Sequence, residues 1–318
     1  MAHELEILES GTASMAYVGD TPWHGLGVRL PEDVSPAQMQ KAAGLDWTVE
    51  KRAEYFKADD GEFRPNGKYS LVRSTDEKYL TTVGSGWNPV QNSEAFDFFE
   101  EFCRAGKMSM HTAGSLFDGK KVWALAKVSS DFELFGGDKV EGYLLFSNPH
   151  QFGQCIDVRF TPIRVVCNNT LTLSLSKEVQ NAVKMNHSRV FNPEMVKDAL
   201  GLASEQMQDY KEAAEVLGKA RMTDNNFKLF LNKVLAPNSK IDEGKLSQNA
   251  KKVYELLETQ PGSEFAPGTY WSGFNALTYW MDHKQGRSAD ARLNNIWFGG
   301  GRKTKIDALK TALEMATA

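Results

Sequence analysis

The fold is decided by residues 116–123, Leu116-Phe117-Asp118-Gly119-Lys120-Lys121-Val122-Trp123, in which an Asp-Gly pair separates two apolar segments. Asp-Gly is a preferred pair for tight hairpin turns, because both residues tolerate a positive φ. The stretch therefore predicts two strands that lie side by side and run antiparallel.

Three segments downstream continue the β pattern. Residues 140–146 form an apolar run of strand length, which a predicted turn at residues 147–150 follows. Residues 156–161 alternate apolar and polar side chains, which predicts a half-buried strand, and Pro162 then indicates a bulge, an edge or a strand end. Residues 170–175 alternate again. An antiparallel sheet is expected over this part of the chain.

Upstream, the first ninety residues mix strands with short helices. Ser35-Pro36 predicts the start of a helix that stops at Gly44. Residues 47–56 and 63–82 are predicted strands around an Asp59-Asp60-Gly61 turn. Asn92 is expected to open a helix that closes at Gly106.

After Asn192-Pro193 the pattern becomes helical, with predicted helices over residues 193–220, 223–235, 247–258, from 269 onward, and 305–316. Strands followed by helices predict the α+β class: an antiparallel sheet with packed helices in the N-terminal part and a helical C-terminal part. The expected domains are residues 1–190, which hold the sheet, and residues 191–318, a mainly helical region packed on it.

Composition limits the class of protein. The 318 residues are 41% hydrophobic, which is ample for a packed core. No apolar run approaches the length of a membrane span, and the acidic first ten residues do not resemble a secretory signal. Three scattered cysteines suit a reducing compartment, so a cytoplasmic protein is expected.

The net charge of −4 conceals an asymmetry. Residues 1–100 hold 9 Lys and Arg against 17 Asp and Glu, a balance of −8, whereas residues 284–318 hold 7 against 3, a balance of +4. The acidic half and the basic tail could dock on each other between subunits, or the tail could meet an acidic partner. Binding to nucleic acid would therefore need a local basic surface.

One candidate phosphate site lies at residues 297–305, where Gly299-Gly300-Gly301 leads into a basic helix start that Thr304 would cap. Unpaired N–H groups at a helix start favour anions, and Arg302, Lys303 and Lys305 would add charge. The alternative is a flexible surface turn with solvated cations. A Walker A loop is excluded, since that motif places Gly directly before Lys.

A second candidate site lies between residues 151 and 170. Arg159 and Arg164 could bind phosphates and Asn168 and Asn169 a base edge. The favoured alternative is that Arg159 pairs with a nearby carboxylate and the two Asn residues form a turn. Lys120 and Lys121, on the neighbouring hairpin, would extend a phosphate-binding surface, and Trp23 or Trp297 would stack on bases.

No catalytic residue, metal site or cofactor is predicted. His150 and Cys155 lie five residues apart without a second ligand pair, and no nucleophile motif is present. His24, which follows Trp23, has no assignable carboxylate partner. An enzyme acting on nucleic acid or nucleotide, with Asp157 in a carboxylate cluster, is the third option behind two kinds of binding protein.

Four phrases resemble a known family, the phage/plasmid-like proteins that contain domain of unknown function 932. They are residues 21–27 (TPWHGLG), residues 90–92 (VQN), residues 164–171 (RVVCNNTL), and the tail from residues 268–271 (GTYW) through residues 275–278 (NALT) and 282–283 (DH) to residues 297–299 (WFG). The resemblance spans nearly the full length. It implies a phage, prophage or plasmid gene that acts inside a bacterial cell, and it brings no catalytic residues.

The leading hypothesis is a non-enzymatic, homo-oligomeric protein that binds single-stranded DNA and assists recombination or replication, by analogy with the single-strand annealing proteins of phages. The alternative is a protein-interaction module that binds a host protein, for which the acidic first hundred residues would provide the surface.

Overall fold

The computed structural model describes residues 6–8, 10–19, 26–104, 107–164, 166, 169–170, 182–185, 187, 194–238, 245–286 and 289–318. The chain forms two compact units. Unit 1 gathers Met1–Ser129, Leu144–Arg159 and Ala182–Ala199, and unit 2 gathers Ser130–Tyr143, Phe160–Asn181 and Leu200–Ala318. Each unit collects segments that are distant in the sequence, and a division of the chain at residue 190 stays a prediction.

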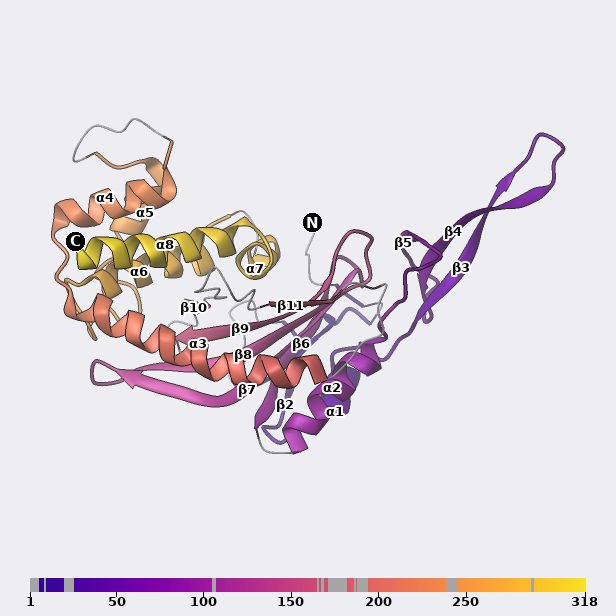
Figure 1. Cartoon of the computed structure of the whole chain (residues 1–318), viewed down its shortest axis with the longest axis horizontal. Coiled ribbons are helices and arrows are strands. Elements are labelled where there is room, and N and C mark those ends of the chain that lie inside the picture. Colours follow the sequence, from indigo (N-terminus) through magenta and orange to yellow (C-terminus); the bar gives the residue numbers. More distant parts are fainter. Residues whose placement is uncertain are drawn as a thin grey trace. The chain divides into compact units, whose positions relative to one another are not determined.

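The larger sheet has the strand order β10-β9-β8-β7-β6-β1-β2, and β11 also pairs with β9 (Figure 1). Its strands are β1 (Met15–Val18), β2 (Val28–Leu30), β6 (Met108–Leu116), β7 (Lys121–Leu134), β8 (Asp138–Pro149), β9 (Ile156–Arg164), β10 (Asn169–Thr170) and β11 (Ala182–Met185). The described pairings are antiparallel, except that β1 and β2 are parallel. The predicted antiparallel sheet is confirmed.

The hairpin at the centre of the prediction joins β6 to β7, with Leu116 opposite Lys121. Its loop contains four residues rather than two. Phe117, Asp118 and Gly119 all have positive φ, of 54°, 57° and 86°. The Asp-Gly pair therefore predicted the position of the turn correctly, but the turn is longer than predicted.

A smaller sheet contains β3 (Val49–Lys57), β4 (Phe63–Arg73) and β5 (Tyr79–Gly84), in that order. The predicted single strand over residues 63–82 is wrong, because a turn after Arg73 divides it. Asp76 accepts a hydrogen bond from the Lys78 N–H at 3.2 Å, and Glu77 has a φ of 56°. An aspartate that hydrogen-bonds the backbone two residues on is a turn former.

One predicted strand boundary also needs correction, because β8 continues through Pro149, where a turn was expected. Pro162 lies within β9, so of its three predicted alternatives the strand end is excluded. The alternation from Ile156 to Thr161 predicted one solvated face, yet Asp157 and Arg159 are buried as well. The two side chains neutralise each other as an ion pair, which allows their burial.

The helices begin with α1 (Pro36–Ala42) and α2 (Asn92–Arg104) and continue with α3 (Glu194–Lys219), α4 (Asp224–Leu235), α5 (Gln248–Tyr254), α6 (Tyr270–Tyr279), η1 (Trp280–Lys284), α7 (Ala289–Trp297) and α8 (Gly300–Thr317). Ser35 forms a capping box with Gln38, and Thr223, Ser247 and Thr269 cap their helices as the sequence predicts. Strands thus dominate the N-terminal part and helices the C-terminal part, which confirms the α+β class.

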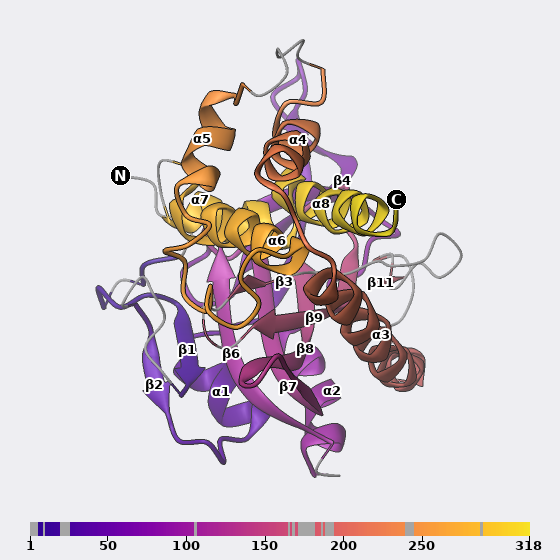
Figure 2. The ribbon, with the colours of Figure 1, turned by 90° about the vertical axis from the view of Figure 1, so that its left-hand side faces the viewer.

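The last two helices differ from expectation. The final helix begins at Gly300, with Gly299 as its N-cap, rather than at Lys305 after a Thr304 cap. The residues just before it belong to α7, which ends at Trp297. α8 packs against α4, α6 and α7 (Figure 2), and its cations therefore belong to a packed helix, not to a free turn.

Each unit has its own apolar core. Trp123, Phe96, Phe99 and Phe146 are almost fully buried in unit 1, where the Phe99 and Phe146 rings meet edge to face at 6.0 Å. In unit 2, Trp271 is the centre of an aromatic cluster that Tyr210 and Phe274 contact at 6.0 Å.

Candidate interaction surface

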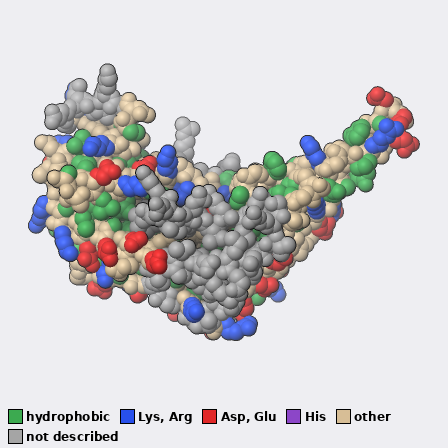
Figure 3. Space-filling model, viewed as in Figure 1, with side chains coloured by type: hydrophobic (Ala, Val, Ile, Leu, Met, Phe, Trp, Pro, Cys, Tyr) green, Lys and Arg blue, Asp and Glu red, His purple; other side chains and the backbone are tan. Residues whose placement is uncertain are grey.

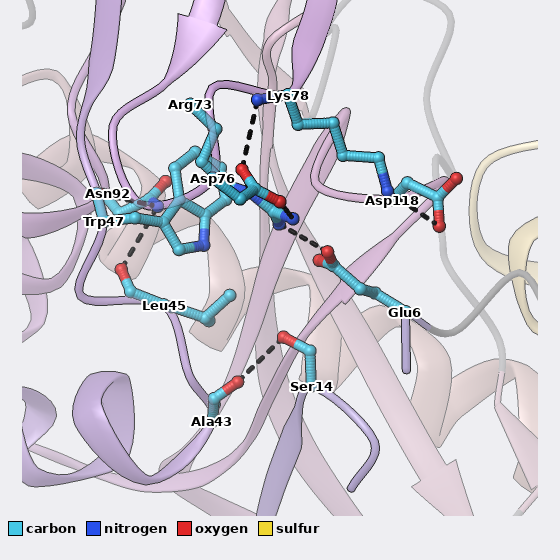
Figure 4. Close-up of polar contacts among 10 residues, drawn as sticks. All are labelled: Glu6, Ser14, Ala43, Leu45, Trp47, Arg73, Asp76, Lys78, Asn92 and Asp118. Atoms are coloured by element: carbon cyan, nitrogen blue, oxygen red, sulfur yellow. Dashed lines mark hydrogen bonds and ion pairs between the residues drawn. The ribbon is translucent and has the colours of Figure 1, made fainter. Parts of the chain in front are cut away.

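The three strands β3, β4 and β5 form an arm of unit 1, and Arg73 fixes its base (Figure 4). The Arg73 guanidinium pairs with Asp76, with Nη2 and Oδ2 2.5 Å apart, and with Glu6 of the N-terminal segment. Hydrogen bonds to Asp76 and Glu6 raise the pKa of Arg73, and the Arg73 bond lowers the pKa of Asp76 to about 2. The side chains of Arg73 and Glu6 are 7% and 2% exposed, so the ion pair lies in a dry setting.

A second link to the arm comes from Gln91. Its side-chain Oε1 accepts a hydrogen bond from the Val49 N–H at 2.8 Å, and its Nε2 donates to the Val49 carbonyl at 3.0 Å. The Gln91 amide thus satisfies both backbone groups of Val49, as a neighbouring strand would. It fixes the first residue of β3 to the start of α2.

Asn92, the residue after Gln91, carries a third link. Its Nδ2 donates to the carbonyls of Leu45 and Trp47 at 3.2 and 3.3 Å, which turns Oδ1 toward His150 (Figure 4 shows the Leu45 bond). Nε2 of His150 lies 3.0 Å from that oxygen, so the ring donates from Nε2. The His150 ring also meets the Trp47 ring edge-on at 5.3 Å.

Two histidines in this region are buried in their neutral form. Burial, with a smaller contribution from His187, lowers the pKa of His150 to about 3. Burial likewise lowers the pKa of His187 to about 4, and its ring stacks on Trp87 at 4.1 Å. Asn88 donates its N–H to the His187 carbonyl at 2.7 Å. Both rings are closed to solvent, at 0% exposure, which favours a structural role for the two histidines.

Within the arm, Glu54 joins the three strands. Its carboxylate on β3 accepts hydrogen bonds from Ser70 on β4 at 2.8 Å and Thr82 on β5 at 2.5 Å. Asn66 adds a third bond at 3.2 Å. The bonds from Thr82, Ser70 and Asn66 together lower the pKa of Glu54.

Beyond this point the arm has only two strands. β5 pairs with β4 from Lys68 to Val72, so residues 55–65 are paired only with each other. We call residues 55–65 the distal hairpin. Its large apolar side chains are open to solvent, with Tyr55, Phe56 and Phe63 exposed by 58%, 51% and 69% (Figure 3). An aromatic cluster with no core beneath it is typical of a binding surface.

The register distributes these side chains over both faces of the distal hairpin. Tyr55 lies opposite Pro65 and Lys57 opposite Phe63, so these four share one face. Phe56 lies opposite Arg64 on the other face. Burying such an aromatic side chain stabilises a complex by about 1.5–3 kcal/mol.

Carboxylates surround the turn at the tip. Asp59, Asp60 and Glu62 outnumber Lys57 and Arg64, which gives the distal hairpin a charge of −1. Arg64 is paired with Asp60, whereas Asp59 and Glu62 form no ion pair with any residue that the structure describes. Figure 3 shows the acidic side chains gathered at the tip beyond the apolar ones.

The structure gives Arg159 a partner of its own. Its Nε lies 2.6 Å from Oδ2 of Asp157, and the side chain is only 9% exposed, so Arg159 pairs with a nearby carboxylate. Lys121 is also buried, with Nζ 5.8 Å from the Phe117 ring centroid. Lys120 is half-buried, and its carbonyl accepts a hydrogen bond from the His150 N–H at 2.8 Å.

Other predicted contacts fall where the structure describes only the backbone or nothing. Arg164 and Asn169 are opposite each other in β9 and β10. Asn168, Trp23 and His24 lie outside the described residues.

The predicted phosphate contact at Lys305 is wrong. Lys305 is fully buried, and its Nζ lies 2.8 Å from Oδ1 of Asp282, a residue of the π-helical turn η1. Burial lowers the pKa of Lys305, and Asp282 opposes this. On the same helix Arg302 is half-buried and Lys303 is exposed.

The glycines before α8 also have a structural explanation. The Gly301 N–H donates to Oδ1 of Asn295 at 3.0 Å, so a side chain binds one of the helix-start donors expected to bind an anion. A Cβ on Gly301 would lie 2.8 Å from Nδ2 of Asn295. A side chain at position 301 would therefore press on Asn295, which packs against the helix start.

The cations predicted to line one phosphate channel belong to both units. Arg159 and Lys121 lie in unit 1, and Arg302, Lys303 and Lys305 lie in unit 2. Arg159 and Lys305, the two with resolved ion pairs, are each neutralised by an aspartate.

The distal hairpin was the part that sequence reasoning missed. The two strands and the Asp59-Asp60-Gly61 turn were predicted, but their exposure was not. A signal was present, because Tyr55 and Phe56 are adjacent and so must face opposite sides of the strand. Apolar side chains on both faces of a hairpin require either two covering layers or a partner.

Among the residues that the structure describes, no three His, Cys, Asp or Glu side chains are grouped to hold a metal ion. The helices that the described residues form include none with the length and apolar character needed to cross a bilayer.

Comparison with known proteins identifies a family. No curated protein and no solved structure matches the chain significantly. The model of the family described as Domain of unknown function (DUF932) matches residues 79–297, which include the Gln91-Asn92 link, β6 to β9 and the η1 aspartate. The chain belongs to this family.

Proposed function

We propose that the chain is a protein-interaction module that engages a protein partner through the distal hairpin. The observation that supports this proposal is the exposure of Tyr55, Phe56 and Phe63 on a two-stranded ribbon whose turn is acidic. Aromatic side chains are enriched at interface centres, and charged residues at the rim. The distal hairpin has this arrangement, with the apolar side chains before the turn and the carboxylates around it.

The way the arm is attached also supports docking. Arg73, Gln91 and Asn92 fix its base through buried contacts, and Glu54 fixes its middle. A binding element held rigidly loses less conformational entropy when it binds, which favours affinity. In the setting that the family resemblance implies, a phage or plasmid gene acting in a bacterial cell, the partner is a protein present in that cell.

The test is capture from a nuclease-treated bacterial lysate with the tagged chain, followed by measured affinity for the captured protein. We expect Tyr55→Ser/Phe63→Ser to weaken binding at least about tenfold, since each interface anchor contributes more than about 1 kcal/mol. Both side chains are exposed, so the variant keeps its fold.

The matched control is Phe152→Ser, which removes an aromatic side chain of unit 1 that is 68% exposed outside the arm. We expect wild-type affinity from this control. Equal affinity of wild type and Tyr55→Ser/Phe63→Ser would refute the proposal.

Single-stranded DNA is the second candidate partner, and one observation favours it. Phe56 lies opposite Arg64, and Phe63 lies opposite Lys57, so each face of the distal hairpin pairs an aromatic ring with a cation. Proteins that bind single strands combine base stacking with phosphate contacts in this way. The acidic turn opposes such binding, which is why we rank it second.

The DNA candidate has its own test, the fluorescence anisotropy of a labelled oligothymidylate. DNA binding requires an affinity that falls as salt rises, because phosphate contacts release counterions. It also requires Lys57→Ala/Arg64→Ala to reduce the salt dependence. Absence of binding at low salt would exclude this candidate and leave the protein partner.

A further inference from the structure

We infer that the partner of the distal hairpin is a second copy of the same chain, whose α8 region receives it; this inference rests on the proposed function. The resulting contact joins unit 1 of one copy to unit 2 of the next. It names the occupant of a surface that would otherwise expose three aromatic side chains in the free protein.

The charges of the two surfaces are opposite. The tip of the distal hairpin carries Asp59 and Glu62, both exposed and without an ion pair among the described residues. On α8, Lys303 and Lys310 are also exposed. No ion pair joins either lysine to another part of the chain that the structure describes. Seven residues separate them, so they lie on one side of the helix.

The charge of the surrounding segments has the same signs. Residues 284–318 have a balance of +4 even with Asp307 on the same helix, and residues 1–100 have a balance of −8. Complementary potentials steer association and fix its register. One sequence therefore carries both halves of an electrostatically matched contact.

Unit 2 also offers apolar surface on a helix that contacts α8. α4 packs on α8, and Leu229 on α4 is 48% exposed. An aromatic side chain such as Phe63 would cover it. The proposed contact thus has an apolar centre and a charged rim, as stable interfaces have.

Such a contact joins two different surfaces of the chain. In a twofold dimer it forms twice, with the distal hairpin of each copy on α8 of the other, and in a head-to-tail arrangement it repeats around a ring or along a filament. The inference therefore predicts that the chain self-associates.

The experiment is sedimentation velocity of the full chain at about 0.15 M and about 1 M salt, where the Debye length falls from about 8 Å to about 3 Å. We expect a dimer or larger oligomer at the lower salt and a shift toward the mass of one chain at the higher salt. A monomer at both salts, at concentrations of tens of micromolar, would overturn the inference.

Charge reversal identifies the surfaces. Asp59→Lys/Glu62→Lys and Lys303→Glu/Lys310→Glu should each reduce the assembly to the mass of one chain, and the four substitutions combined should restore it. Lys251→Glu/Lys252→Glu, two exposed lysines of α5, is the matched control and should assemble as wild type does. Assembly that survives either reversal, or is not restored by the combination, contradicts the inference.

The outcome separates the inference from the proposed function. A monomeric chain whose capture of a host protein is lost in Tyr55→Ser/Phe63→Ser would contradict only the second copy as partner. A chain whose assembly and capture are both indifferent to the hairpin substitutions would contradict both. An oligomer that forms only with added oligonucleotide would point to nucleic acid and overturn the inference.

Discussion

At the residue scale, the buried ion pairs stabilise the fold, and other, exposed residues are the candidates for binding. Charged side chains that the sequence alone would place on the surface are buried in three ion pairs, Arg73–Glu6, Arg159–Asp157 and Lys305–Asp282. An unpaired buried charge is expensive, so each member requires its partner. These residues hold the fold, whereas the exposed side chains of the distal hairpin are free to bind.

Arg73→Met should destabilise the protein strongly. It leaves the Glu6 carboxylate buried without its cation, which costs about 3–5 kcal/mol. The free energy of unfolding in urea measures this. Arg104→Ala, which removes the exposed pair with Glu100, is the matched control and should cost no more than about 1 kcal/mol. Similar losses in the two variants would contradict the buried role of Arg73.

Lys305 tests the other buried pair. Lys305→Met alone should cost about 3–5 kcal/mol, because Asp282 then lacks a partner. Replacing both residues by Met and Leu should recover most of that loss, since an apolar pair of similar volume is often as stable as a buried ion pair. Thermal or urea unfolding of the single and double variants gives the comparison. A double variant no more stable than the single one would refute this reading of the pair.

The two buried histidines predict acid sensitivity. Both are neutral when folded, with pKa values of about 3 for His150 and about 4 for His187, whereas 6.5 is the ordinary value. The unfolded chain therefore binds more protons below pH 6.5, so stability is full above that pH. It is lost as the pH falls toward 4, by up to about 1.4 kcal/mol per pH unit for each histidine.

His150→Gln checks the assignment, because glutamine stays neutral and can still donate to Asn92. Between pH 6.5 and pH 4, the free energy of unfolding of the variant should fall less steeply than that of the wild type. An unchanged slope would mean that His150 is not buried as a neutral ring.

At the element scale, the sequence predicted what local chemistry controls. Ser35, Thr223, Ser247 and Thr269 marked four helix starts, because a cap acts within one turn of its helix. The antiparallel hairpin at residues 116–123 followed from Asp-Gly for the same reason.

The errors arose where side-chain contacts made in the folded structure decide. The start of α8 depends on Asn295, which binds the helix-start N–H of Gly301 from the preceding helix. The burial of Arg159 depends on pairing with Asp157, and that of Lys305 on an aspartate 23 residues away. Cations that a sequence pattern places in solvent can thus be buried. Arg159 and Lys305, two of the predicted phosphate contacts, are buried in this way.

The arm provides an element-scale prediction. Glu54→Ala removes the hydrogen bonds that join β3 to Ser70 and Thr82, and a two-stranded ribbon alone is marginally stable. Amide hydrogen exchange should accelerate in β3, β4 and β5 while the amides of β6 to β9 stay protected. Uniform acceleration throughout unit 1, or none in the arm, would contradict the role of Glu54.

At the scale of the whole molecule, the central proposal is that a protein partner covers the distal hairpin. Charge decides between the candidate partners: the turn is acidic, and the cations expected to attract DNA are in part buried and paired. The opposite charge of the C-terminal segment makes a second copy the partner that fits.

The most direct measurement is photo-crosslinking in bacterial cells with benzoylphenylalanine in place of Phe63, compared with the same group in place of Phe152. The account predicts a protein crosslink from position 63 that position 152 does not give, and a second copy of the chain as the crosslinked product. No protein product from position 63, the same products from both positions, or a crosslink to nucleic acid alone would contradict it.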